Sequence, residues 1–314
     1  MATNIPPHNI GEVIDGLIKL IRNNEISHTE LNKTIVGPDF PTGGELILNQ
    51  KDKKEIYTNG RGSFIINSKW LIEDLKNGMY QIVINEIPYQ VNKIKIIEQL
   101  ANLINLKKIP LEDVIDESDE NIRIVLKPKN RNLDSQKLID ICFKLTDLSI
   151  KYSCNFNVLL NGIEPKQIGL IDILLNFLDH RKNSIKRKSV FNIDKIKKRL
   201  EILKGYQIVF KNIEKIIKII RTKNDPKKEL ISKFKLTNLQ VESILSMRLG
   251  SLKKIDEKNI ISEILNLKKD LNYLKKLISD KKSMNNYISN ELSEILKEID
   301  LKNKNRKSKI LKES

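Results

Sequence analysis

The second half of the chain carries apolar residues at helical spacing. One stripe advances by three, four, three and then seven residues, with the polar Gln207 at the skipped position, through Ile193, Ile196, Leu200, Leu203 and Phe210. A second stripe alternates steps of four and three residues through Ile260, Ile264, Leu267, Leu271, Leu274 and Ile278. Spacings near 3.5 residues keep side chains on one seam of a helix, which is typical of coiled coils. The pattern therefore predicts two long heptad helices.

Between the two stripes, Asp225-Pro226 interrupts the helical pattern. Proline lacks a backbone donor and clashes with the preceding turn, so the first long helix is expected to end before it. Two short helical segments follow at 226–234 and 238–249, and Gly250 closes the second. Heptad helices on both sides of such a segment predict an antiparallel coiled-coil arm with a small helical knob at about 225–252.

The first 165 residues mix both kinds of pattern. Periodicity predicts helices at 10–23, 30–33, 92–105 and 135–145, and runs of β-branched and aromatic residues predict strands at 62–66, 80–86 and 122–127. A dense cluster of Gly and Pro at 37–44 excludes regular structure there. The expected fold class is α+β: a mixed α/β domain at 1–165, the coiled-coil arm at 166–300, and a basic tail at 301–314 that we expect to be loose.

Charge adds a direction to this picture. The 314 residues include 57 Lys and Arg against 40 Asp and Glu, a net charge of +17. Such a surplus suits a polyanionic partner, because cations that neutralise phosphates release condensed counterions. A/T-rich codons also favour Lys, Ile and Asn, so a solvated helix face is an equal alternative. No apolar stretch has the length of a membrane helix and no secretory leader is visible, which predicts a cytoplasmic protein without a membrane partner.

Patterns that would carry chemistry are weak. The carboxylates at 116–120 could hold Mg²⁺, but such clusters are more often solvated loops. The three histidines have no ligand spacing, and the two cysteines, Cys142 and Cys154, lack the CxxC spacing of zinc sites. Neither a Gly-rich phosphate loop nor a Gly-x-Ser-x-Gly elbow occurs. The residues by themselves therefore predict no catalytic residue, no metal site and no cofactor in this chain.

Several strings resemble, in order, those of the A subunits of bacterial type IIA topoisomerases. In the first half they are 1–9 (MATNIPPHN), 37–42 (GPDFPT), 60–63 (GRGS), 87–93 (IPYQVNK) and 116–119 (DESD). In the second half, strings more similar to topoisomerase IV than to gyrase stand at 146–148 (TDL), 199–205 (RLEILKG), 225–227 (DPK) and 282–285 (KSMN). The resemblance covers nearly the whole chain.

What the resemblance implies about fold agrees with the pattern of the residues. It implies a mixed α/β tower domain, then two long antiparallel helices that end in a small knob, the exit gate through which two copies dimerise. It also implies cleavage of one duplex, passage of another and religation, which relaxes and decatenates DNA. The implied partners are double-stranded DNA, a second copy of the chain, and the B subunit of topoisomerase IV, which carries Mg²⁺ and ATP.

One departure from the family concerns the nucleophile. In the family, it is a tyrosine directly after an arginine, in a winged-helix segment that precedes the NIPPHN string. Here that string begins at Asn4, and none of the seven tyrosines follows an arginine. We therefore assign no catalytic residue, and we expect a fragment, or one half of a split gene, that is inactive in cleavage by itself.

The resemblance also implies residues that contact DNA. An isoleucine on the helix after the PPHN string is expected to insert between base pairs, and we assign Ile14 to this role. Such a wedge unstacks one step, and the bent duplex then touches more basic surface. His8, Asn9, Arg61 and Lys69 are the implied phosphate contacts. Without the resemblance, Ile14 is an ordinary core residue and the other four are solvated side chains.

In the knob, Leu245, Met247 and Leu249 are the candidate dimer contacts, since a symmetric dimer pairs one patch with itself. The alternative is that they form the core of the tip. Other functions stay open as well: a fragment of the gyrase A subunit, or a DNA-bending scaffold that kept the shape after losing the chemistry. The coiled coil alone also suits a chromosome-structural arm protein, which would need a nucleotide-binding head.

Overall fold

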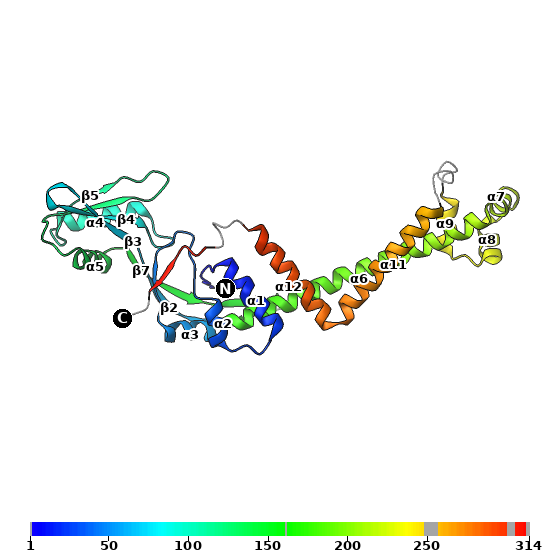
Figure 1. Cartoon of the computed structure of the whole chain (residues 1–314), viewed down its shortest axis with the longest axis horizontal. Coiled ribbons are helices and arrows are strands. Elements are labelled where there is room, and N and C mark those ends of the chain that lie inside the picture. Colours follow the sequence, from blue (N-terminus) through cyan, green and yellow to red (C-terminus); the bar gives the residue numbers. More distant parts are fainter. Residues whose placement is uncertain (1, 161, 248–256, 300–304, 312–314) are drawn as a thin grey trace. The chain divides into compact units, whose positions relative to one another are not determined.

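The computed structural model describes residues 2–160, 162–247, 257–299 and 305–311. It divides into two compact units, one of Met1–Leu178 with Ser289–Ser314 and the other of Asp179–Ile288. The sequence pattern predicted these boundaries at 165 and 300 instead. Two helices, α6 (Leu170–Lys211) and α12 (Lys281–Glu298), have residues in both units (Figure 1).

The first unit is a mixture of helices and strands. Its helices are α1 (Ile10–Arg22), α2 (His28–Thr34), α3 (Gln50–Asn59), α4 (Lys93–Asn105) and α5 (Ser135–Leu145), with a 3-10 turn, η1 (Lys76–Gly78). Its strands are β1 (Glu45–Ile47), β2 (Arg61–Asn67), β3 (Lys69–Asp74), β4 (Tyr80–Glu86), β5 (Leu111–Asp116), β6 (Ile124–Pro128), β7 (Ser149–Asn155), β8 (Asn157–Leu160), β9 (Glu164–Gln167) and β10 (Lys309–Leu311). The mixed α/β character expected of this region is confirmed.

Two four-stranded sheets organise this unit. One has the strand order β10-β1-β2-β7, and the other has the order β3-β4-β6-β5. Helices α4 and α5 cover one face of the second sheet through a buried apolar cluster that includes Ile82, Leu126, Leu100 and Leu138. Strands β8 and β9 form a separate antiparallel hairpin.

The expectation of a loose tail is wrong for its described part. Strand β10 pairs in parallel with β1, with Ile310 opposite Leu46. The Arg306 guanidinium donates to the Glu12 carboxylate over 2.8 Å and to the carbonyl oxygen of Pro38 over 2.6 Å. The buried Ser308 hydroxyl accepts from the backbone N–H of Phe40 over 2.8 Å. Backbone pairing and side-chain contacts, which no local pattern encodes, thus fasten residues 306–311 to the first unit.

The second unit is helical among its described residues. It contains most of α6, then α7 (Ile213–Thr222), α8 (Pro226–Phe234), α9 (Asn238–Leu245), α11 (Glu257–Ser279) and the start of α12. The sequence predicted that the first long helix continues until the break at Asp225-Pro226, but α6 ends at Lys211, and the φ of −133° at Asn212 is not helical. The predicted segment 238–249 ends earlier, at Leu245.

Apolar residues of the two predicted stripes meet between α6 and α11. Leu200 and Leu203 share one buried cluster with Ile260 and Ile264. Arg199 donates to both carboxylate oxygens of Glu263, over 2.7 and 3.1 Å, and earlier residues of α6 lie beside later residues of α11. The two helices therefore run antiparallel along this seam (Figure 1). None of the helices in the described ranges is long and apolar enough to cross a membrane.

Candidate nucleic-acid interface

The string at residues 2–9 is held at two points, by strand β7 and by the turn at 37–44. Asn4 and Asn155 of β7 exchange two backbone hydrogen bonds of 2.8 and 2.9 Å. Further along the string, the carbonyl oxygen of Pro7 accepts from the N–H of Asp39 over 2.9 Å. Two prolines between these points fix φ and leave little backbone freedom. The intervening Ile5 is 42% exposed, so the string carries an exposed apolar side chain on a backbone that is held at both ends.

Beside this string, β2 and β7 form an open polar surface. Arg61 lies opposite Asn155, and Ile65 lies opposite Lys151. Directly opposite residues of an antiparallel pair carry their side chains on the same face. Arg61 and Lys151 are both exposed, so two cations share this face. We call Arg61, Ile65, Lys151 and Asn155 the β2–β7 row.

His8 does not offer a free ring nitrogen. Its Nε2 is 2.8 Å from the Tyr57 hydroxyl and its Nδ1 is 2.8 Å from the carbonyl oxygen of Pro6. Burial lowers the pKa of His8 to about 4, so the ring is neutral at pH 7. Both ring nitrogens are thus engaged within the protein, and the expected role of His8 as a phosphate contact stays a prediction.

Asn9 is likewise committed within the protein. It is buried and caps α1, where its Oδ1 accepts from the N–H groups of Gly11 and Glu12 over 3.0 and 3.3 Å. Its Nδ2 donates to Asp39 over 3.0 Å. A phosphate could reach Asn9 only by displacing this cap, and the expected role of Asn9 as a phosphate contact stays a prediction. The short string PHN followed by an apolar helix could have indicated an N-cap.

Ile14, the expected wedge, is a core residue. It is only 4% exposed and shares the buried face of α1 with Leu17, Leu20 and Ile21. Insertion between base pairs would require its removal from this core. The apolar side chain that sequence reasoning missed is Ile5. An isoleucine directly before two prolines cannot lie within a helix, which was the available signal.

The remaining two expected contacts are differently placed. Arg61 is exposed at the start of β2, where a ligand could reach it. Lys69, at the start of β3, forms an ion pair of 3.0 Å with Glu86, which also accepts from the N–H of Gly44. The structure thus leaves Arg61 as the better cation for phosphate, and it does not bring Lys69 into the β2–β7 row.

Polar side chains around Glu12 join helix α1 to the segment that precedes the C-terminal strand. Glu12 accepts from Arg306 and also from the N–H of Val36 over 2.8 Å. The ammonium group of Lys53 donates to the carbonyl oxygen of Asn32, and burial lowers the pKa of Lys53 to about 8. These groups are buried or half-buried and bonded within the protein, so they hold α1, the segment at 32–38 and Arg306 together.

The pKa values of three tyrosines are shifted in the direction that disfavours a nucleophile. Burial raises the pKa of Tyr57, Tyr80 and Tyr152. A nucleophilic hydroxyl needs a lowered pKa or an adjacent base. These three phenols are therefore poor candidates for attack on a phosphodiester.

The acidic string at 116–120 has a structural role in part. Asp116 ends β5 and forms a 2.8 Å ion pair with Lys93, which lowers the pKa of Asp116 to about 2. In the part of the chain that the structure describes, no three His, Cys, Asp or Glu side chains gather as metal ligands would.

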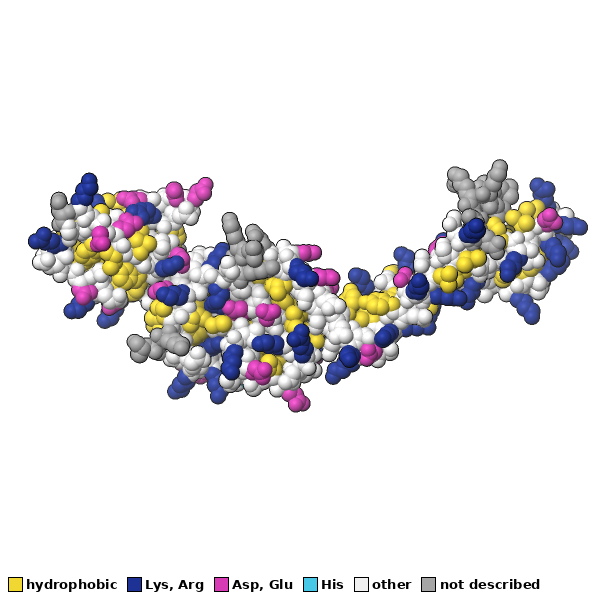
Figure 2. Space-filling model, in the orientation of Figure 1, with side chains coloured by type: hydrophobic (Ala, Val, Ile, Leu, Met, Phe, Trp, Pro, Cys, Tyr) yellow, Lys and Arg dark blue, Asp and Glu magenta, His cyan; other side chains and the backbone are white. Residues whose placement is uncertain are grey.

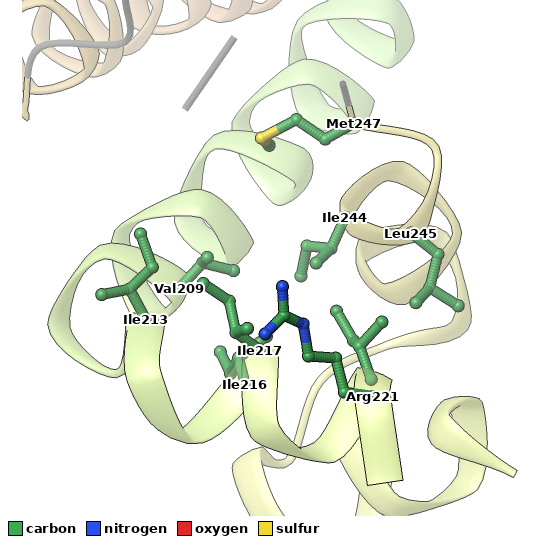
Figure 3. A pocket seen from close by; sticks show the side chains of 9 residues that line it. Val209, Ile213, Ile216, Ile217, Arg221, Ile244, Leu245 and Met247 are labelled. Carbon is green, nitrogen blue, oxygen red and sulfur yellow. The ribbon is translucent and has the colours of Figure 1, made fainter. Parts of the chain in front are cut away.

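The expected dimer contacts are only partly described. Leu245 ends α9 and is 41% exposed, and Met247 is half-buried. Leu249 lies outside the described residues. Both described side chains line a groove with α7, which Figure 3 shows from close by.

Comparison with known proteins gives consistent matches. The family model for the A subunits of DNA gyrase/topoisomerase IV matches residues 1–293. The A subunit of DNA topoisomerase 4 from Rickettsia conorii is 44% identical over 296 residues, which are 94% of this chain and 40% of that protein. The Caulobacter vibrioides protein of the same name is 42% identical over 264 residues (84% and 35%), and that of Escherichia coli K12 is 36% identical over 295 residues (93% and 39%). The chain therefore spans about two fifths of the length of these curated relatives.

Proposed function

The chain belongs to the family formed by the A subunits of DNA gyrase and topoisomerase IV. From this premise we propose that it is the DNA-binding and dimerising part of a topoisomerase IV A subunit. The match of residues 1–293 supports the family, and the name shared by the relatives supports topoisomerase IV over gyrase. In this proposal the first unit is the tower domain, and the seam of α6 and α11 is the coiled-coil arm of the exit gate.

The observation that carries DNA binding is the rigid string beside the β2–β7 row, with its exposed cations Arg61 and Lys151. Figure 2 shows Lys and Arg side chains spread over the visible surface, with fewer Asp and Glu among them. Arg61 and Lys151 neutralise phosphates, which positions the duplex without reading its sequence. Ile5, and not Ile14, is the apolar wedge, because its side chain is exposed on a backbone fixed at both ends. Unstacking one base step costs a few kcal/mol, which the additional contacts of the bent duplex offset.

In this proposal the chemistry of strand passage requires more than this chain. The B subunit holds ATP and Mg²⁺, and the tyrosine that attacks the DNA phosphate is not among the seven of this sequence. The raised pKa of Tyr57, Tyr80 and Tyr152 supports that assignment. By itself the chain binds and bends DNA without cutting it, and it joins a topoisomerase that relaxes and decatenates DNA only in the complex.

Dimerisation is assigned to the end of the second unit. Leu245 and Met247 present apolar surface beside α7, and a twofold axis would place each against its counterpart. A cytoplasmic, nucleoid-associated location follows from the proposed substrate.

The experiment that tests this function measures bending of a short duplex labelled at both ends, by fluorescence transfer. The wild-type chain should raise transfer, and Ile5→Ala should lower it while the affinity falls less than about threefold, as expected for a contact that deforms DNA more than it holds it. Ile65→Ala, at an exposed isoleucine on the β2–β7 row, is the matched control and should bend DNA normally. Unchanged bending by Ile5→Ala would refute the role of Ile5 as the wedge. A covalent adduct between this chain and DNA would refute the proposal that the attacking tyrosine is not among the seven of this sequence.

A further inference from the structure

The second unit contains an apolar groove of about 340 Å³. It is lined from α7 by isoleucines and Arg221, from the end of α9 by Ile244 and Leu245, and by Met247 just after α9 (Figure 3). Three of the lining residues, Val209, Ile216 and Ile244, also belong to the buried core of the tip, so the groove lies directly against that core. A volume of this size matches the lower end of small-molecule sites.

The described lining of the groove carries positive charge and no negative charge. Figure 3 shows the Arg221 guanidinium among the isoleucine side chains, and it is the only charged group among the described lining residues. Within the described part of the chain, no ion pair or hydrogen bond engages this guanidinium. An arginine so placed offers its planar donors to a carboxylate, sulfonate or sulfate.

From these features we infer that the groove binds small anionic amphiphiles, molecules with an apolar chain or ring system and one terminal anion. The apolar part lies against Ile213, Ile217 and Ile244, and the anion pairs with Arg221 at the exposed mouth. Because the head group stays near water, it avoids the desolvation penalty that a fully buried anion would suffer.

This ligand site overlaps the surface assigned to dimerisation. Leu245 and Met247 line the groove and are also the proposed dimer contacts. A bound amphiphile would therefore occupy space that a second copy needs. Ligand binding rests only on the groove, however, so it can be measured whether or not the chain dimerises.

The test uses the full chain and anilinonaphthalene sulfonate, whose fluorescence rises in apolar sites. Decanoate, below its micelle concentration, should displace the dye, whereas decyltrimethylammonium of the same chain length should displace it at least about fivefold less well. Arg221→Gln should weaken decanoate about fivefold, the upper range for a solvent-exposed ion pair. Lys218→Gln removes the same charge one turn earlier, from an exposed residue outside the groove, and should bind decanoate as the wild type does.

A second variant separates the apolar contribution from charge. Ile217→Ser lies on the lining and outside the buried core of the tip, so the chain should melt within a few degrees of the wild type while dye binding is lost. Equal displacement by the anionic and cationic amphiphiles, or equal losses in the Arg221 and Lys218 variants, would overturn the inference. Sedimentation in the presence of decanoate reports dimerisation separately, and a chain that binds decanoate as a monomer still supports the site.

Discussion

Replacement of Ile14 by alanine tests whether this residue belongs to the core of α1 or to the DNA interface. Its side chain is 4% exposed, and Leu17, Leu20 and Ile21 share the buried face. Ile→Ala at a buried site costs about 2–4 kcal/mol, through lost transfer energy and the cavity that remains. For a unit of roughly 200 residues, each kcal/mol lowers Tm by about 2–4 °C.

We therefore expect Ile14→Ala to melt about 4–16 °C below the wild type. Ile5→Ala removes a side chain that is already 42% exposed, and it should cost no more than about 1 kcal/mol. Differential scanning calorimetry measures both variants, and the fluorescence-transfer assay measures bending at a temperature where both are folded.

The two variants should thus separate stability from bending. Ile14→Ala should bend DNA normally once folded, and Ile5→Ala should be stable but deficient in bending. An Ile14→Ala chain that melts within about 2 °C of the wild type and no longer bends DNA would refute the reasoning from burial.

Three further outcomes follow from the described contacts. The folded-state pKa of His8, about 4, lies below its usual 6.5, so the unfolded chain binds a proton at a higher pH than the folded chain does. The free energy of unfolding should therefore fall by roughly 1–3 kcal/mol from pH 6.5 to pH 4. His8→Gln should flatten that part of the pH profile. Arg306→Gln leaves the half-buried Glu12 without its ion pair and should lower the free energy of unfolding by about 2–3 kcal/mol. Backbone hydrogen exchange at residues 306–311 should become faster, and unchanged exchange there would contradict the proposed attachment of the C-terminal strand. Leu245→Asp should shift the sedimentation profile toward monomer, while Leu265→Asp, at an exposed position on α11, should leave it unchanged; equal behaviour would remove Leu245 from the interface.

Elements with strong local patterns could be predicted from the sequence. The predicted strand at 80–86 and the helix at 135–145 coincide with β4 and α5. Both segments carry apolar residues at the period of their structure, and Asp134 caps the helix. Helix α3 was missed, because its sequence QKDKKEIYTN contains few apolar residues to mark a period.

Contacts distant in sequence could not be predicted. The tail looks polar and basic, yet Ser308 is buried because backbone groups of the turn at 37–44 meet its hydroxyl. The interruption of α6 at Asn212 has no proline or glycine to announce it. In both cases tertiary packing decides, and local propensity carries no record of it.

At the candidate site, too, the residue types could be read from the sequence but their contacts could not. The polar residues at 8 and 9 looked like ligand contacts because their types suit phosphate, but burial commits both to the protein's own backbone and side chains. Residue type indicates what a side chain can bind, whereas exposure decides whether a ligand can reach it. Arg61 met both conditions.

The most direct measurement is the affinity of the chain for a short duplex over a range of salt concentrations. Cations on the β2–β7 row predict that the logarithm of the binding constant falls linearly with that of salt, by about 0.9 per phosphate contact. The double variant Arg61→Gln, Lys151→Gln should reduce this slope by roughly 2. Absence of duplex binding in low salt, or a slope that the double variant leaves unchanged, would contradict the account.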